Sequence, residues 1–237
     1  MLIHLGNFFF KYRTVVFPLC LPLALVPAPT LFHDPMVAAA IGFALALCGE
    51  FVRSSTIGMQ YIVRGGRDRR VYARDLVTGG LYAHTRNPMY IGNVLILAGL
   101  TISSNSWLAV GLLLPLYLFV CACIVAAEEL YLSDRFGEAF EEYCRDVPRW
   151  LPRFDGLDMT IADHDFNWRR LVLKEYGTLL GWTWTWGALY LWNLARSPGG
   201  TEANRAEAAC VVSLMLATLA AWIAARVIKK ARLWKAA

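Results

Sequence analysis

Long runs of apolar residues, separated by short polar segments, follow one another along the 237-residue chain. An α-helix needs about 20 mostly apolar residues to cross the hydrocarbon core of a bilayer. Runs that approach this length cover residues 12–29, 36–52, 88–103, 107–127, 176–195 and 208–228. The pattern predicts an all-α, polytopic membrane protein with about six transmembrane helices.

Two of these runs carry features that alter the expected helix. The first contains Pro18, Pro22 and Pro27, which predict a kinked or broken helix because proline lacks an N–H group. The second could extend to residue 63 as a helix that leaves the membrane, with Glu50 and Arg53 paired at the interface. No small-residue cleavage site follows the first run, so we expect no cleaved signal peptide.

Basic residues are concentrated before the first run, between the second and third runs, and after the sixth. They are Lys11, Arg13, Arg64, Arg67, Arg69, Arg70, Arg74, Arg86 and those of the tail KKARLWKAA. By contrast, connections 30–35 and 104–106 carry no Lys or Arg, and 196–207 carries only Arg196 and Arg205. Because lysine and arginine accumulate in cytosolic loops, we expect an integral, multi-pass protein with both termini in the cytosol.

The composition agrees with a membrane environment. Hydrophobic residues make up 57% of the chain and charged residues only 17%, which lies outside the balance of soluble domains. The net charge of +5 is explained by the basic cytosolic segments and by attraction to anionic lipid headgroups. We therefore expect the membrane as a partner and no nucleic acid.

Several residue types that often mark metal or redox sites have simpler interpretations here. Five of the six cysteines lie inside predicted spans and Cys144 on the cytosolic side, so we interpret them as packing residues and expect no metal site. The motif Asp163-His164-Asp165 lacks a second ligand cluster, which favours a solvated loop. Interfacial anchoring or helix packing is expected for Trp182, Trp184, Trp186 and Trp192.

A basic and polar stretch precedes the third run. Pro88 suits the first position of a helix, and Asn87 is a good N-cap residue. The positive end of the helix dipole would attract an anion there, with Arg86 available for a charged pair and His84 nearby. A simpler interpretation is a helix cap beside an arginine that reaches a lipid phosphate, and this stretch alone leaves both open.

Two adjacent acids, Glu128 and Glu129, stand at the inner edge of the fourth run. At a helix C-terminus they would face the unfavourable end of the dipole, so either the helix continues past them or they face a cation. An apolar stripe at helical spacing follows, which we interpret as an amphipathic helix on the inner leaflet. The stripe consists of Leu132, Phe136, Phe140 and Tyr143.

These two features bracket one helical hairpin at the same membrane depth. An anion-attracting helix start and a cation-attracting acid pair would together suit a zwitterionic or mixed-charge ligand from the cytosol. A second reactant would then arrive through the lipid.

The same residues carry a resemblance. The run LVTGGLYAHTRNPMYIG, then a hairpin, then EELYLSDRFGEAFEEYCRDVPRWLP resembles the membrane methyltransferases of the isoprenylcysteine carboxyl methyltransferase and phospholipid methyltransferase superfamily. It covers residues 76–152. We accordingly divide the chain into N-terminal helices with a basic loop (1–75), a methyltransferase core (76–153) and an extension with two spans (154–237). Asn87 stands where the prenylcysteine branch has His, and Phe140 replaces the first Tyr of the later motif.

The resemblance implies S-adenosylmethionine as cofactor, bound from the cytosol. Its α-carboxylate would meet Arg86 and the start of the third span, and its ammonium or ribose hydroxyls would meet Glu128. Arg149 would cap the pocket, and Gly79, Gly80 and Gly92 would let backbones approach closely. The cofactor would further be lined by Arg74, Asp75, Leu76, Val77, Gly80, Tyr82, Asn87, Pro88, Met89 and Tyr90.

The implied reaction is in-line displacement of a methyl group from sulfonium by a lipid or lipidated acceptor, in which the enzyme mainly positions the reactants. An acceptor carboxylate needs no base, whereas an amine must lose a proton, which Glu129 or His84 would take. A prenylated cysteine, a phospholipid amine and another amphiphile all fit as acceptor. A small transporter or channel lined by these charges and a non-catalytic membrane scaffold are the competing hypotheses, and the oligomeric state is left open.

Overall fold

The computed structural model describes residues 2–60, 71–197 and 202–231. Four arginines that entered the orientation argument, Arg64, Arg67, Arg69 and Arg70, lie outside these residues, as do the side chain of Cys20 and residues 232–237 of the tail.

All regular secondary structure in the described part of the chain is helical, and no strand occurs there. In chain order they are α1 (Leu2–Cys20), η1 (Leu21–Leu25), α2 (Pro35–Met59), η2 (Gly80–Ala83), α3 (Pro88–Ser103), the π-helical turn η3 (Ala109–Leu113), α4 (Leu114–Phe136), α5 (Glu138–Asp146), α6 (Leu157–Asp163), α7 (Trp168–Arg196) and α8 (Glu202–Lys230). Each of the six apolar runs thus lies largely within helix.

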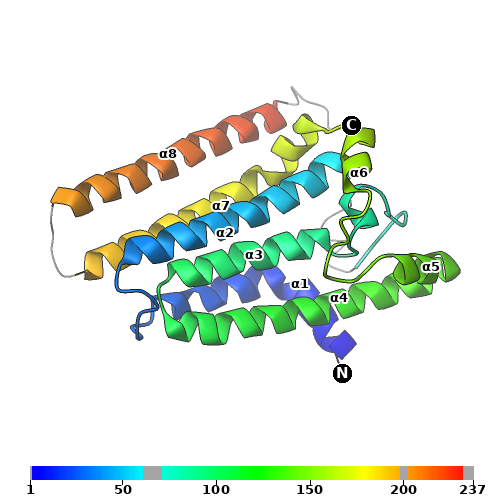
Figure 1. Cartoon of the computed structure of the whole chain (residues 1–237), viewed down its shortest axis with the longest axis horizontal. Helices are drawn as coiled ribbons and strands as arrows, with labels where there is room; N and C mark the ends of the chain where they lie inside the picture. Colours follow the sequence, from blue (N-terminus) through cyan, green and yellow to red (C-terminus); the bar gives the residue numbers. More distant parts are fainter. Residues whose placement is uncertain (1, 61–70, 198–201, 232–237) are drawn as a thin grey trace.

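The long helices run side by side, with α8 packed on α7 at one margin and α1 beside α4 at the other (Figure 1). Among the described residues, three helices are long and apolar enough to cross a bilayer, namely Pro35–Met59, Ala109–Phe136 and Asn204–Lys230, and Pro88–Ser103 is a shorter apolar helix. The all-α, polytopic membrane fold is therefore confirmed. That α1, α3 and α7 also cross the bilayer stays a prediction.

One end of the bundle gathers most of the short elements. The start of α1, the ends of α2, α4 and α8, and the starts of α3 and α7 all lie there, together with η2, α5 and α6 (Figure 1). Successive long helices therefore run in alternating directions, which agrees with both termini on one side of the membrane. Whether that side is cytosolic stays a prediction.

The first helix differs from its predicted bounds. It begins at Leu2, so Lys11 and Arg13 lie inside α1 and not in a loop before it. The first part of α1 packs against α4 at Gly6, where an added Cβ would lie 2.1 Å from the carbonyl oxygen of Cys123, and this tertiary contact accounts for the early start. The expected break is present, since the α-helix ends at Cys20 and continues as the 3-10 turn η1.

Helices α2 and α3 approach each other through glycines. A Cβ atom added at Gly42 would lie 2.3 Å from the carbonyl oxygen of Gly99, and one added at Gly92 would lie 2.7 Å from that of Gly49. Small residues allow such contact between helices in a bilayer, where packing takes over much of the role of the hydrophobic effect. The expectation that Gly92 lets two backbones approach closely is confirmed.

Two of the tryptophan side chains of α7 are buried between helices, and two lie at the surface of the bundle. Trp182 and Trp186 are buried in the main apolar cluster with residues of α2 and α3, and the indole N–H of Trp186 donates to the carbonyl oxygen of Ala39 at 2.9 Å. Trp184 and Trp192 are exposed at the bundle surface. The helix-packing interpretation is therefore correct for the first two.

We predict that Gly42→Ala destabilises the bundle, because the new methyl group would overlap the backbone of α3; overpacking of this kind costs about 1–3 kcal/mol. Thermal unfolding of the purified protein in detergent should give a lower Tm. The control is Gly177→Ala on α7, where an added Cβ meets nothing within 4 Å and the better helix propensity of alanine should hold or raise the Tm. Equal Tm values for the two variants would contradict the packing described here.

Candidate functional site

The site begins at the turn before α3. Gly80 has a φ angle of +59°, which glycine adopts without strain, and a Cβ there would lie 3.2 Å from Met59 at the end of α2. The N–H group of Gly80 donates to Nε2 of His164 at 3.0 Å. Gly80, predicted to approach the cofactor, thus lets η2 approach the end of α2.

The start of α3 is held by the segment that follows α5. Pro88 is the first residue of α3 and Asn87 occupies the N-cap position, as predicted, but the Asn87 side chain makes no capping hydrogen bond. Its Nδ2 instead donates to the carbonyl oxygen of Arg149 at 3.0 Å, and the backbone N–H of Arg86 donates to that of Pro148 at 2.9 Å. These bonds join the two motifs that the sequence separates by a hairpin.

A cluster of charges forms where these segments meet. Nη1 of Arg86 lies 3.6 Å from Oε1 of Glu129, and Nε of Arg149 donates to the same oxygen at 3.0 Å, while Nη2 of Arg149 pairs with Oε2. The expected convergence of Arg86 with an acid at the end of the fourth run is therefore present. Two guanidinium groups share one carboxylate, which leaves one positive charge over.

Arg86 is further held by Cys144 of α5, whose Sγ accepts from Nη1. Within the part of the chain that the structure describes, the Nε atom of Arg86 is buried and has no hydrogen-bond partner. A buried donor without a partner costs roughly 1–3 kcal/mol, so this nitrogen is suited to a ligand acceptor.

The neighbouring acid faces a different partner. Successive residues on an α-helix point about 100° apart, so Glu128 does not join the arginines but accepts a hydrogen bond from the Tyr90 hydroxyl at 3.0 Å. The charge of Arg13 on α1 also acts on Glu128 through space. Helix α4 continues past both acids to Phe136, and Glu129 also faces two arginines. The expected continuation of the helix and the expected cationic partner are therefore both present.

The apolar stripe after the acids packs on the protein itself. Phe140, Tyr143 and Val147 form a buried cluster with Leu76 packed against it, which overturns the expected position of the stripe on the inner leaflet. The Tyr143 hydroxyl donates to the carbonyl oxygen of Tyr82 at 2.8 Å. Burial raises the pKa of Tyr143 above its ordinary value, so this hydroxyl stays a neutral donor.

His84, a predicted catalytic residue, is 4% exposed and has both ring nitrogens engaged. Nδ1 lies 2.9 Å from the carbonyl oxygen of Arg153, and Nε2 lies 2.9 Å from Oγ1 of Thr160 on α6. Since the backbone oxygen can only accept, Nδ1 carries the proton in this arrangement. This environment favours a positioning role over proton transfer.

The remaining predicted cofactor residues fall into two groups. Arg74 and Asp75 are on the surface, with side chains 82% and 80% exposed, and pair with each other at 3.9 Å. Val77, Tyr82 and Met89 instead belong to one apolar cluster with Ile57. The structure therefore brings Arg86, Asn87, Tyr90, Glu128, Glu129 and Arg149 together, and leaves Arg74 and Asp75 apart from them.

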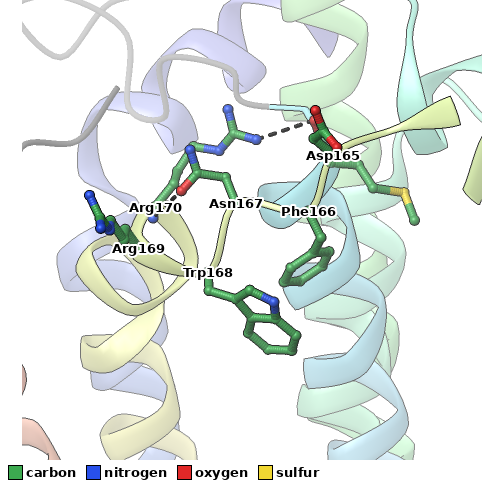
Figure 2. Close-up of a pocket in the computed structure, with 7 residues that line it drawn as sticks. Asp165, Phe166, Asn167, Trp168, Arg169 and Arg170 are labelled. Atoms are coloured by element: carbon green, nitrogen blue, oxygen red, sulfur yellow. Dashed lines mark hydrogen bonds between the residues drawn. The ribbon is translucent and has the colours of Figure 1, made fainter.

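An open hollow of about 500 Å³ lies elsewhere at this end of the bundle, between the end of α2 and the start of α7. Its lining, from Met59 and residues 165–170, includes none of the predicted site residues (Figure 2). Arg170, which was not predicted, donates from Nε to the carbonyl oxygen of Ile57 at 2.8 Å and from Nη2 to that of Gly58 at 2.6 Å. The hollow therefore lies beside the arginine side chain that caps the C-terminal end of α2.

Sequence reasoning missed residues whose partners are distant in the chain. His164 was treated as part of a solvated loop, yet it holds Gly80, and its Nδ1 lies 2.9 Å from the carbonyl oxygen of Thr160. Glu175 stands one residue before the fifth apolar run and is buried. The one available signal for Glu175 was an acid directly beside an apolar run.

The fold and the charged cluster together define a polytopic all-α membrane protein with an ionic site at one end of its bundle. Residues 37–139 match the family model of the phospholipid methyltransferases. This part of the chain is similar to the membrane methyltransferases, among them the phospholipid and isoprenylcysteine enzymes, which confirms the resemblance.

Three curated proteins are similar to parts of the chain. A protein-S-isoprenylcysteine O-methyltransferase of Schizosaccharomyces pombe is 32% identical over 121 residues, covering 48% of each chain. The nickel-cobalt-cadmium resistance protein NccN of Alcaligenes xylosoxydans is 26% identical over 131 residues, covering 55% of this chain and 59% of the relative. The cobalt-zinc-cadmium resistance protein CzcN of Cupriavidus metallidurans is 32% identical over 78 residues, covering 33% and 36%.

The matched part of the chain thus spans between 36% and 59% of the length of these curated relatives. No solved structure shows significant similarity to it.

We predict that Glu129→Gln destabilises this end of the bundle. The change would leave Arg86 and Arg149 without the carboxylate that they share, and hydrogen bonds to charged groups contribute about 2 kcal/mol. Thermal unfolding in detergent should show a lower Tm for this variant. Glu142→Gln on the exposed side of α5, beyond the first turn of that helix, is the control and should leave the Tm unchanged. If Glu129→Gln unfolds at the same temperature as the control, the cluster does not join these segments.

Proposed function

We propose that the protein transfers a methyl group from S-adenosylmethionine to a lipid-like acceptor at the cytosolic face of a membrane. The observation that carries this proposal is the convergence of Arg86, Arg149 and Glu129 beside the Tyr90–Glu128 pair. The similarity of residues 37–139 to the phospholipid methyltransferases, and of the chain to an isoprenylcysteine O-methyltransferase, supports the reaction class.

The residues of the cluster fit the charges of the methyl donor. The arginine pair with Glu129 keeps one positive charge over, which suits the α-carboxylate of the donor, and the buried Nε of Arg86 is an available hydrogen-bond donor for it. The carboxylate of Glu128 suits the ammonium group or the ribose hydroxyls. A site with one positive and one negative part selects a zwitterion over a simple anion or cation.

When bound, the donor supplies a methyl group on a positively charged sulfur. The protein would contribute mainly by position, because holding two reactants in line lowers the barrier by several kcal/mol. Arg86 and Arg149 would orient one end of the donor, and Glu128 with Tyr90 the other. The buried Tyr82 and Met89 beside them would keep water from the reaction.

The acceptor decides whether the protein must also take up a proton. A carboxylate acceptor, which the resemblance to the isoprenylcysteine carboxyl methyltransferases implies, attacks directly. An amine acceptor must first lose a proton, and Oε2 of Glu128 is better suited to receive it than Glu129, whose charge two arginines stabilise, or His84, whose ring nitrogens are both engaged.

The orientation and the acceptor class rest on two further observations. Both ends of the described chain lie at the same end of the bundle as the site (Figure 1). Arg86, directly before α3, and Arg145, in α5, belong to elements of this end. The acceptor is proposed to be a prenylcysteine carboxylate or a phospholipid amine, because the matched family model and the Schizosaccharomyces pombe relative carry these two names.

We predict that S-adenosylhomocysteine, the product of the donor, binds the detergent-purified protein, and that Arg86→Met and Glu128→Gln each weaken binding about tenfold or more. Isothermal titration calorimetry measures the dissociation constants. Arg135→Met, an exposed arginine near the end of α4, is the matched control and should bind as the unmodified protein does. Absence of heat with a folded, unmodified sample would rule out the proposal and would leave the non-catalytic scaffold as the better hypothesis.

The acceptor itself is identified by transfer of a labelled methyl group. Protein, labelled S-adenosylmethionine and total membrane lipid should give a labelled lipid that chromatography separates as an ester or as a methylated amine. With an amine acceptor the rate should rise with pH as the ammonium form loses its proton, whereas a carboxylate acceptor should give little change between pH 6 and pH 9. Flux of small ions into liposomes without any labelled product would instead support the transporter hypothesis.

A further inference from the structure

A buried ion pair lies outside the site described above. Arg53 on α2 is 4% exposed, and its Nη2 lies 2.5 Å from Oε1 of Glu175 on α7, to which its Nε also donates at 2.6 Å. The expected pairing of Arg53 with Glu50 at the interface is replaced by this contact, since Glu50 accepts a hydrogen bond from Nε1 of Trp182 at 3.0 Å. Ionisable residues inside a bundle of membrane helices are costly and commonly mark a function.

The other side of the Arg53 guanidinium belongs to α3. Nη1 donates to Oδ1 of Asn93, and the aliphatic part of the side chain runs over Gly92, where a Cβ atom would lie 2.5 Å from Cγ of Arg53. One side chain therefore contacts α3 and α7 at the same time. A guanidinium group can do so because its donors are fixed in a plane and point in several directions.

Asn93 connects this pair to the proposed methyl-transfer site. It follows Tyr90 by three residues on α3, so the two side chains lie on the same face of the helix. Tyr90 is the residue whose hydroxyl holds Glu128. A shift or rotation of α3 at Asn93 would therefore move Tyr90 relative to Glu128.

Helix α7 makes other hydrogen bonds to α2, so the ion pair is not needed to hold these two helices together. Arg170 already caps the end of α2, and Trp182 already bonds Glu50, so α7 is fixed on α2 at two points without Arg53. What Arg53 adds is the bond to α3. A buried ion pair often contributes little to the net free energy of unfolding, and an apolar contact could hold α2 and α7 together as well. The presence of the Arg53–Glu175 pair therefore favours a role in fixing the position of α3.

We propose that Arg53, paired with Glu175, is a positioning residue that fixes the start of α3 and thereby the Tyr90–Glu128 pair. This inference rests on the proposed methyl transfer for its catalytic consequence. It gives the helix α7, which lies beyond the matched segment 37–139, a part in the reaction.

The test uses Arg53→Lys in the full chain. Lysine keeps the positive charge opposite Glu175 but has a single ammonium group in place of the planar fork, so the simultaneous bond to Asn93 is lost. We expect kcat/KM for S-adenosylmethionine to fall about tenfold or more, because the Tyr90–Glu128 pair that Arg53 positions also holds the donor, while the Tm falls no further than in the control variant. Tyr190→Phe is the control, because it removes a buried α7 hydrogen bond, to Glu207 at 2.6 Å, at the opposite end of the bundle.

Amide hydrogen exchange gives a readout that needs no activity. Residues 89–96 at the start of α3 should exchange faster in Arg53→Lys than in the unmodified protein and in Tyr190→Phe. Unchanged exchange there, or a loss of kcat/KM that only follows the loss of folded protein, would overturn the positioning role. If the unmodified protein transfers no methyl group, the proposed function fails on its own, and the exchange of residues 89–96 still decides whether Arg53 fixes α3.

Discussion

The carboxylate that Arg86 and Arg149 share is the interaction on which the rest of the site depends. Glu129 sits near the end of a long apolar helix, where an unpaired charge would be costly, and two arginines from separate segments compensate it. To reach Glu129, the turn before α3 and the loop after α5 must both fold back onto α4. The same folding brings Tyr90 to Glu128 and closes Tyr143 onto the carbonyl oxygen of Tyr82.

Charge inside the bundle is organised in two layers. At the end of the bundle, Arg86, Glu129 and Arg149 keep an excess positive charge beside the Tyr90–Glu128 pair. Further along the helices, Arg53 and Glu175 compensate each other in a fully buried position. The outer layer can bind a charged ligand because it is not fully compensated, whereas the inner layer is paired and suited to holding α3 in place.

The parts of the fold that depend on local sequence could be predicted from it. The apolar runs predicted the six long helices, and Pro88 predicted the start of α3. The expected contact between Arg86 and an acid of α4 is present as the pair with Glu129. Contacts between distant segments could not be predicted in this way. The early start of α1 depends on how Gly6 meets α4, and the burial of Phe140 depends on the cluster that Leu76 joins. An imidazole such as that of His84 can act as a base. Its hydrogen bonds to Arg153 and Thr160 instead show that it connects the turn before α3 to the segment that includes α6.

The most direct measurement of the central claim is the ¹⁵N chemical shift of Arg86 Nε–H in the detergent-solubilised protein, recorded while S-adenosylhomocysteine is added. This donor is buried and without a partner in the described structure, so a bound carboxylate should shift its signal strongly, while the exposed Arg74 should stay unchanged. A ligand that binds and moves Arg74 but leaves Arg86 unmoved would contradict the account.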